Sequence, residues 1–195
     1  MKILIITGTP KKDGLSCDCV AAAERGARAG GAEVEVARVC GMGIGHCRVC
    51  GDGWGTCEGK HSCSFGQDGF TELQQKIRDC DALIAQSPVY WGEQSETLKS
   101  FFDRLRRCEA PRHEGGCMYN KPAVIIAAPG GSGKKGLTCL DQMEGVMNHL
   151  HAAMFDYFYV NRWNADYKIA AIEACAKALA GGRLPEIEAR TVGVV

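Results

Sequence analysis

The chain has 195 residues, which suits one domain or one domain with a tail. Hydrophobic residues make up 46% and charged residues 24%, a composition typical of ordinary globular proteins. Lys and Arg total 23 and Asp and Glu total 23, so the zero formal net charge argues against nucleic-acid or membrane partners. The first apolar run, residues 3–6, is too short for a signal-peptide core or a membrane span, and we expect a cytoplasmic protein.

Residues 2–7 form a continuous, largely β-branched run that a glycine ends, typical of a strand buried on both faces of a parallel sheet. A loose apolar stripe of helical period predicts a helix over 16–29, and a Gly-Gly pair stops it. Residues 33–39 alternate as a half-buried strand does. The following segment, 41–69, is rich in glycine and cysteine and predicts a long loop.

The rest of the chain continues the alternation of strands and helices. Phe70, Leu73 and Ile77 lie on one face of the helix expected after the loop. The further predicted elements are a strand over 82–87, a helix over 93–107, a strand over 122–128, a helix over 137–153, a strand over 155–160 and a helix over 166–180.

This alternation indicates an α/β fold with right-handed crossovers. Five such strands predict a doubly wound, flavodoxin-like parallel sheet of order 2-1-3-4-5. We expect one domain over 1–182, with the 41–69 loop inserted after strand two. Residues 183–195 are expected to form a tail over the surface or onto a partner subunit. In this topology the ligand crevice lies at the carboxyl ends of the strands, beside strand one.

The loop after strand one carries hydroxyls and leads into a helix N-terminus. Free backbone N–H groups and the helix dipole there favour an anion such as a phosphate. The alternative is an ordinary turn with Ser16 as the helix N-cap. The loop lacks a GxGxxG pattern, which argues against dinucleotide binding of the Rossmann type. The candidate binding residues are Thr9, Lys11, Ser16 and Cys17.

The segment after strand three is Pro88, Val89, Tyr90, Trp91 and Gly92. Core packing would account for one of its aromatic residues, but a loop at this edge of a sheet normally carries polar turn residues. A flat apolar ligand stacked on Tyr90 or Trp91 accounts for the whole set, and we favour that interpretation.

The loop after strand four is rich in glycine, which allows backbone to approach a ligand closely. It differs from a P-loop because Ala128 stands at the first glycine position and Lys135 at the Ser/Thr position that would hold magnesium. A nucleotide triphosphatase is therefore not expected. The candidate binding residues are Pro129, Gly130, Gly131 and Gly133.

Together these loops resemble the NADPH-dependent FMN reductases of flavodoxin-like fold and, more narrowly, the related iron–sulfur flavoproteins. The resemblance reaches to about residue 160. Its implications are an FMN phosphate held by the strand-one loop and an isoalloxazine ring lined by 88–92 and 129–133. The markers are Thr9 and Ser16, the segment Ser87 to Gly92 before Leu98-Lys99, the run Phe102-Asp103-Arg104, and the glycine loop.

The resemblance also implies a function. The flavin would take reducing equivalents from NAD(P)H, or from a ferredoxin-type protein donor, and pass them to a small acceptor such as a quinone or free flavin. The alternative is an electron-transfer or redox-sensing iron–sulfur flavoprotein without small-substrate turnover. Family members pair around their flavins, which implies a homodimer or homotetramer. No side chain is nominated as a catalytic acid or base.

The chain has twelve cysteines, and without an export signal they do not predict a disulfide framework. Four stand singly in apolar settings and are interpreted as small buried hydrophobic residues: Cys40, Cys80, Cys139 and Cys175. Four others, Cys47, Cys50, Cys57 and Cys63, crowd into the 41–69 loop.

Four thiolates in one glycine-rich loop could ligate a [4Fe–4S] cluster or a zinc ion. The loop lies where the iron–sulfur flavoproteins carry their cluster cysteines, although Gly53 replaces the third cysteine of their compact motif. The alternative is reduced thiols, with or without a labile disulfide. A zinc ribbon is the weakest interpretation, because only one close Cys-x2-Cys pair is present.

Several charged residues near these motifs receive plainer interpretations. Arg104, Arg106 and Arg107 close a predicted helix, where cations complement the helix dipole. His46 and His61 flank the cysteines and are interpreted as solvated loop residues.

Overall fold

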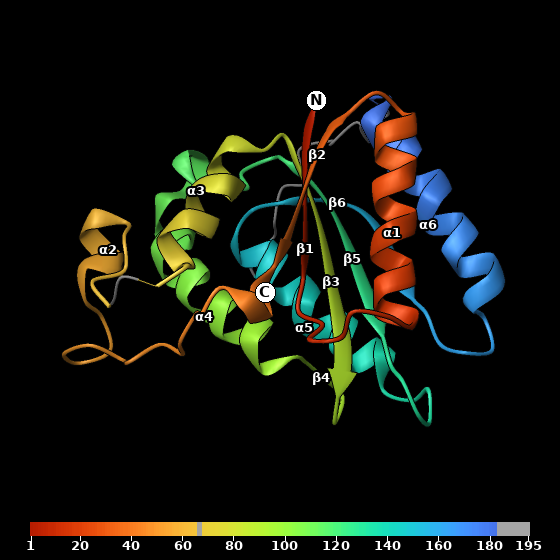
Figure 1. Cartoon of the computed structure of the whole chain (residues 1–195). Helices are drawn as coiled ribbons and strands as arrows, with labels where there is room; N and C mark the ends of the chain where they lie inside the picture. The colour runs from red at the N-terminus through yellow and green to blue at the C-terminus, as the bar shows by residue number, and fades with distance from the viewer. Residues whose placement is uncertain (66–67, 183–195) are drawn as a thin grey trace, which may run out of the picture.

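The computed structural model describes residues 1–65 and 68–182, and its centre is a parallel sheet (Figure 1). The sheet order is β2-β1-β3-β5-β6, which confirms the predicted order of the five parallel strands. These strands are β1 (Lys2–Thr7), β2 (Glu33–Arg38), β3 (Ala82–Tyr90), β5 (Pro122–Ala128) and β6 (Ala153–Tyr159).

Helices cover both faces of the sheet (Figure 1). One face packs against α1 (Leu15–Ala29) and α6 (Ala165–Ala180), and the other against α3 (Phe70–Asp79), α4 (Glu96–Glu109) and α5 (Gly136–His149). Ile3 and Ile5 point to the core beneath α1 and α6, whereas Leu4 and Ile6 point to the core beneath α3, α4 and α5. Because side chains alternate along a strand, a strand covered on both faces needs a continuous apolar run.

A short hairpin corrects the prediction after strand three. The predicted strand stops at residue 87 and the predicted helix starts at 93, but β3 continues to Tyr90 and pairs with an added antiparallel strand, β4 (Glu93–Gln94). Trp91 and Gly92 have φ angles of 56° and 94°. Positive φ at both central residues defines the type I′ turn that suits the twist of two-residue hairpins.

The 41–69 segment packs beside α4 rather than extending away as a bare loop. It begins at the short 3-10 turn η1 (Val39–Gly41) and contains a one-turn helix, α2 (Thr56–Lys60), which the sequence did not predict and which contacts α4. A second 3-10 segment, η2 (Ala110–Gly115), follows α4. The tail predicted over 183–195 lies outside the described residues.

Among the residues that the structure describes, no helix is both long and apolar enough to cross a membrane.

Candidate flavin site and thiol cavity

The three loops expected to carry chemistry leave the sheet at the same edge. They follow β1, β3 and β5, which are neighbours in the sheet. The switch point lies at β1, because the chain moves to β2 on one side of it and to β3 on the other. This is the place where ligands bind in open α/β sheets. The fold therefore brings the predicted flavin-binding segments together.

The ends of β1 and β3 are joined by side chains beneath the first loop. The Thr7 hydroxyl donates to Gln86 Oε1 at 2.5 Å and accepts from the Thr9 N–H at 3.2 Å. Thr9 is buried, and its own hydroxyl accepts from the Lys11 N–H at 3.3 Å. Thr9 therefore shapes the loop, whereas the Lys11 side chain is exposed at its rim.

The N-terminus of α1 is open to an anion. Gly14 precedes the helix with φ 82° and no side chain caps it, so the alternative interpretation of Ser16 as the N-cap is wrong. Backbone pairing starts with the Asp18 N–H donating to the Gly14 carbonyl. The three earlier amides of the helix have no acceptor among the described residues, as expected for an anion site. Ser16 and Cys17 are half-buried there, and the Cys17 thiol donates to the Lys11 carbonyl at 3.3 Å.

The hairpin presents its aromatic residues to solvent. Pro88 is buried and Val89 half-buried, but Tyr90 is 46% exposed and Trp91 is fully exposed at the turn. The interpretation that core packing accounts for one of these aromatic side chains is therefore wrong. Gly92 lies against the side chain of Lys135, where an added Cβ would stand 3.3 Å from the lysine Cβ. The hairpin and the glycine loop are thus neighbours.

The glycine loop is open in its first half and fixed in its second. Pro129 is buried, while a Cβ added to Gly130 or Gly131 would meet no atom within 4 Å. Gly133 packs under the Trp163 ring, which an added Cβ would approach to 2.4 Å. Its carbonyl accepts from the Tyr159 hydroxyl. This loop can therefore offer accessible backbone to a ligand without itself shifting.

Polar atoms under the loops were missed by the sequence interpretation. Gln86 Nε2, Gln94 Oε1 and Ser95 Oγ are buried and have no hydrogen-bond partner among the described residues. Ser95 lies directly below the first loop, since a Cβ on Gly8 would stand 2.1 Å from its Oγ. Unpaired buried polar atoms call for a ligand or water. The available signal was Gln86, a polar residue near the end of an apolar strand.

These features fit FMN. An uncapped helix N-terminus suits its phosphate, and a loop with open backbone beside exposed aromatic residues suits a flat ring with polar edges. Which of the predicted residues touch the flavin stays a prediction.

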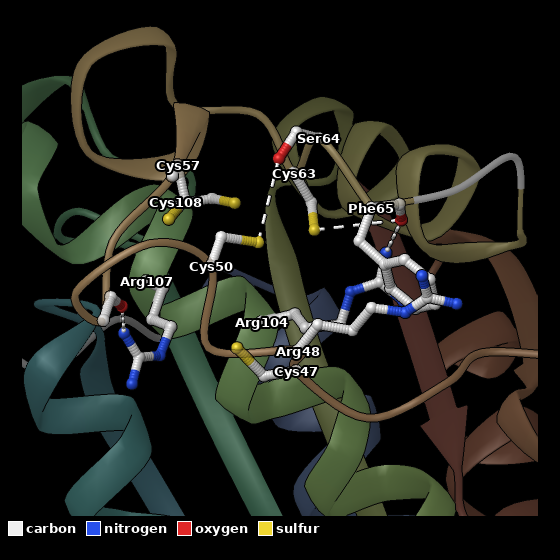
Figure 2. Close-up of a pocket in the computed structure, with 12 residues that line it drawn as sticks. Cys47, Arg48, Cys50, Cys57, Cys63, Ser64, Phe65, Arg104, Arg107 and Cys108 are labelled. Carbon is white, nitrogen blue, oxygen red and sulfur yellow. Dashed lines mark hydrogen bonds between the residues drawn. The ribbon is translucent and has the colours of Figure 1, made fainter.

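A second site lies between the cysteine loop and α4 (Figure 2). It is a small cavity lined by the four predicted cysteines and by a fifth, Cys108, that the sequence interpretation did not single out. We call it the thiol cavity, lined by Cys47, Arg48, Cys50, Gly53, Gly55, Cys57, Cys63, Ser64, Phe65, Arg104, Arg107 and Cys108.

All cysteines of the chain are free thiols in this structure. Cys108 is buried on α4, and burial, followed by the nearby Cys63 and Cys57, raises the pKa of its thiol to about 12. Within residues 1–65 and 68–182, no three metal-ligating side chains lie close enough to hold a single ion. The cavity therefore gathers the thiols around a space instead of at a point.

The interpretation of the α4 arginines as cations at the helix end holds for Arg106 and Arg107, which lie in the last turn, but is wrong for Arg104, which precedes it. Arg104 is 1% exposed, pairs with Asp68, and donates to the carbonyls of Gly45 and Phe65 at 3.1 and 2.9 Å. Arg107 lies over the Trp54 ring and donates to the carbonyl of Gly53. Both line the thiol cavity, because α4 turns this face toward the cysteine loop.

His61 is not a solvated loop residue either. It is half-buried in the left-handed region with φ 53°, and its Nδ1 lies 3.2 Å from the Cys108 carbonyl. Its own carbonyl accepts from Gln74 and Arg78. The histidine therefore anchors the cysteine loop to α3 and α4.

The fold and the loops at its switch point define a flavodoxin-like α/β protein. The chain belongs to the NADPH-dependent FMN reductase family, whose model matches residues 1–165.

Individual relatives agree with this membership. The chain is 33% identical over 96 residues to YwqN of Bacillus subtilis, named as an NAD(P)H-dependent FMN-containing oxidoreductase, covering 47% of this chain and 52% of that protein. It is 32% identical over 115 residues to an iron–sulfur flavoprotein of Methanosarcina thermophila, covering 55% of each. The chain thus spans about half the length of the curated relatives it matches.

Among solved structures, the NAD(P)H:quinone oxidoreductase of Methanothermobacter marburgensis superposes with a TM-score of 0.68 at 17% identity. The match covers 92% of this chain and 96% of that one, and confirms the predicted flavodoxin-like fold.

Proposed function

We propose that the chain is an FMN-dependent oxidoreductase that passes electrons from NAD(P)H to a small acceptor such as a quinone or free flavin. The observation that carries this proposal is the meeting of three loops at the sheet's switch point, around an uncapped helix N-terminus. Family membership supports the cofactor and the nicotinamide donor. Bound FMN would supply the hydride-accepting and electron-donating chemistry.

The residues of the chain have binding and orienting roles in this proposal. The helix N-terminus with Thr9, Lys11, Ser16 and Cys17 would hold the phosphate. Backbone at 129–133 would reach the polar edge of the ring, and the hairpin at 88–92 would cover its face. Tyr90 and Trp91 are exposed and would cover only one face of the flavin ring, so its other face would stay open for nicotinamide or acceptor. A side-chain acid or base is not required, because the cofactor carries the redox chemistry.

The test is a visible absorption spectrum of the purified protein followed by steady-state oxidation of NADPH and NADH. We expect the two bands of bound flavin and rapid nicotinamide oxidation with a quinone or free flavin. A colourless protein that takes up no added FMN would overturn the proposal.

The thiol cavity supports a second candidate function, an iron–sulfur flavoprotein that transfers electrons between a partner protein and the flavin. Nicotinamide oxidation would then be slow, whereas a reduced ferredoxin-type donor would reduce the flavin. Stopped-flow reduction with each donor separates the two candidates. A homodimer or homotetramer, which light scattering tests, and a cytoplasmic location remain part of the proposal.

A further inference from the structure

We propose that the thiol cavity binds a [4Fe–4S] cluster with Cys108 of α4 as one of its thiolate ligands, and that Arg104 Nε donates a hydrogen bond to a sulfur of the bound cluster. The proposal rests on the flavoprotein function above. It adds to the cysteine loop a ligand from the helix that directly follows the flavin-side hairpin.

The thiols converge from two different parts of the fold. Cys57 and Cys63 are half-buried and pack on the same core to which Cys108 belongs, while Cys47 and Cys50 lie on the other lining segment of the loop (Figure 2). Cys108 is fully buried near the C-terminal end of α4, on the helix face that also buries Leu105 and Phe101. A ligand on a helix is fixed before metal binds, whereas thiols on the loop can adjust to the cluster.

Cys108 can also replace a cysteine that the sequence motif of this chain lacks. The compact motif of the resembling family has a cysteine where this chain has Gly53, and Gly53 lines the cavity without a side chain. A thiol from the facing helix can supply the missing ligand.

The charge of the cavity favours an anionic occupant. Three guanidinium groups, those of Arg48, Arg104 and Arg107, line it, and the described lining residues include no carboxylate. Asp68 balances the charge of Arg104 from outside the lining, which leaves the positive charges of Arg48 and Arg107. A [4Fe–4S] cluster with four thiolates carries net negative charge, and binding releases the four thiol protons. A cluster also separates its ligand thiolates more widely than a single ion does, which matches thiols gathered around a space.

An independent observation points to a ligand. Arg104 Nε is buried and has no hydrogen-bond partner among the described residues, although both Nη atoms of the same side chain are paired. The side chain lines the cavity beside Cys63. An unpaired buried N–H on a cation is costly, and a thiolate or sulfide acceptor would satisfy it. Hydrogen bonds to cluster sulfur raise the reduction potential.

The experiment is anaerobic reconstitution of the full chain with ferric iron, inorganic sulfide and excess dithiothreitol, which reduces part of the iron to the ferrous state. Its readouts are iron and sulfide per chain and the EPR spectrum after dithionite reduction. We expect the wild-type protein to take up about four irons. Cys108→Ser should lose at least about tenfold in affinity for the cluster, the range seen when metal sites lose a supporting group. The matched control is Cys139→Ser. Cys139 is also fully buried, but it lies on α5 and does not line the cavity.

FMN content and thermal melting establish that each variant folds. A folded Cys108→Ser protein with full iron would overturn the assignment of this ligand. A wild-type protein that binds FMN and oxidises NAD(P)H but takes up no iron would overturn the cluster while leaving the proposed function standing. A wild-type protein that takes up iron but binds no FMN would support the cluster and overturn the proposed function.

Arg104→Lys tests the hydrogen bond separately. The variant should keep its iron but show a more negative midpoint potential, because lysine has no N–H at the Nε position. An unchanged potential in a fully loaded variant would overturn the role of Arg104.

Discussion

Arg104 and Asp68 form a two-point ion pair, with Nη1 to Oδ2 at 2.5 Å and Nη2 to Oδ1 at 3.2 Å. The arginine belongs to α4 and the aspartate lies at the end of the cysteine loop. Asp68 also accepts from the Gly45 and Phe70 amides. The Asp68 carboxylate therefore holds the backbone at both ends of the cysteine loop and ties it to Arg104 in the wall of the thiol cavity.

We expect Asp68→Asn to lower the free energy of unfolding by about 3 kcal/mol, because removing one partner of a buried pair leaves the other charge uncompensated. Urea denaturation at pH 7 measures this. Asp103→Asn is the control, since Asp103 pairs with Lys99 on the exposed side of the same helix. Equal losses in the two variants would contradict the special role of Asp68.

The same pair predicts a dependence of stability on pH. Partial burial raises the pKa of Asp68, but the hydrogen bonds from Arg104 and two backbone amides outweigh it and hold the pKa below its ordinary value of 3.8. The stabilisation is therefore fully present above pH 3.8 and is lost as the pH falls through the lower pKa of the folded state. Denaturation between pH 5 and 2.5 should show a steeper loss for wild type than for Asp68→Asn. Parallel curves would contradict this assignment.

Glu109 is a buried anchor behind the thiol cavity. Its side chain is 0% exposed and accepts from Arg78, from Gln74 and, at 3.0 Å, from the Cys117 N–H. Glu109→Ala should cost about 3–5 kcal/mol, because it leaves Arg78 and two other donors without their acceptor. The exposed Glu114→Ala should stay within about 0.5 kcal/mol of wild type. Thermal and urea melts compare the two variants.

Trp91 allows stability and ligand binding to be separated. Its side chain is fully exposed and its φ is 56°, a conformation that asparagine tolerates. Trp91→Asn creates the Asn-Gly pair favoured in type I′ turns, so stability should hold or rise by a few tenths of a kcal/mol. We expect FMN binding or acceptor reduction to weaken about threefold to tenfold through lost stacking. Lower stability with unchanged flavin kinetics would instead assign Trp91 to packing.

Ser16 tests the phosphate site. Its hydroxyl lies at the uncapped start of α1 and does not cap the helix, so Ser16→Ala should leave the melting temperature nearly unchanged. Loss of a hydrogen bond to a charged phosphate should weaken FMN binding about tenfold or more. Riboflavin, which lacks the phosphate, should bind wild type and variant equally, as measured by fluorescence titration. Thr138→Ala, on the exposed face of α5, serves as the control. An equal loss for riboflavin would place Ser16 away from the phosphate.

The order of the sheet was predictable because each buried strand has a recognisable pattern in its local sequence. A run such as residues 2–7 is apolar on both faces, and only a parallel sheet covered by helices requires that pattern. The three flavin loops could be predicted for the same reason, since the topology dictates which strand ends meet. The hairpin at 88–94 was missed because its turn, Trp91-Gly92, is not an Asn-Gly or Asp-Gly signal.

The sequence by itself determined the fold class, the family and the loops at the switch point, because all three rest on local patterns and on connectivity. Only the tertiary structure decided the thiol cavity. Cys108 stands 45 residues after Cys63 in the numbering of the chain, and nothing local marks it as different from Cys139. Likewise, Arg104 reads as a helix-end cation until Asp68 and the cysteine loop are folded against it. Contacts between distant segments depend on how α4 packs, and that is set by the whole core.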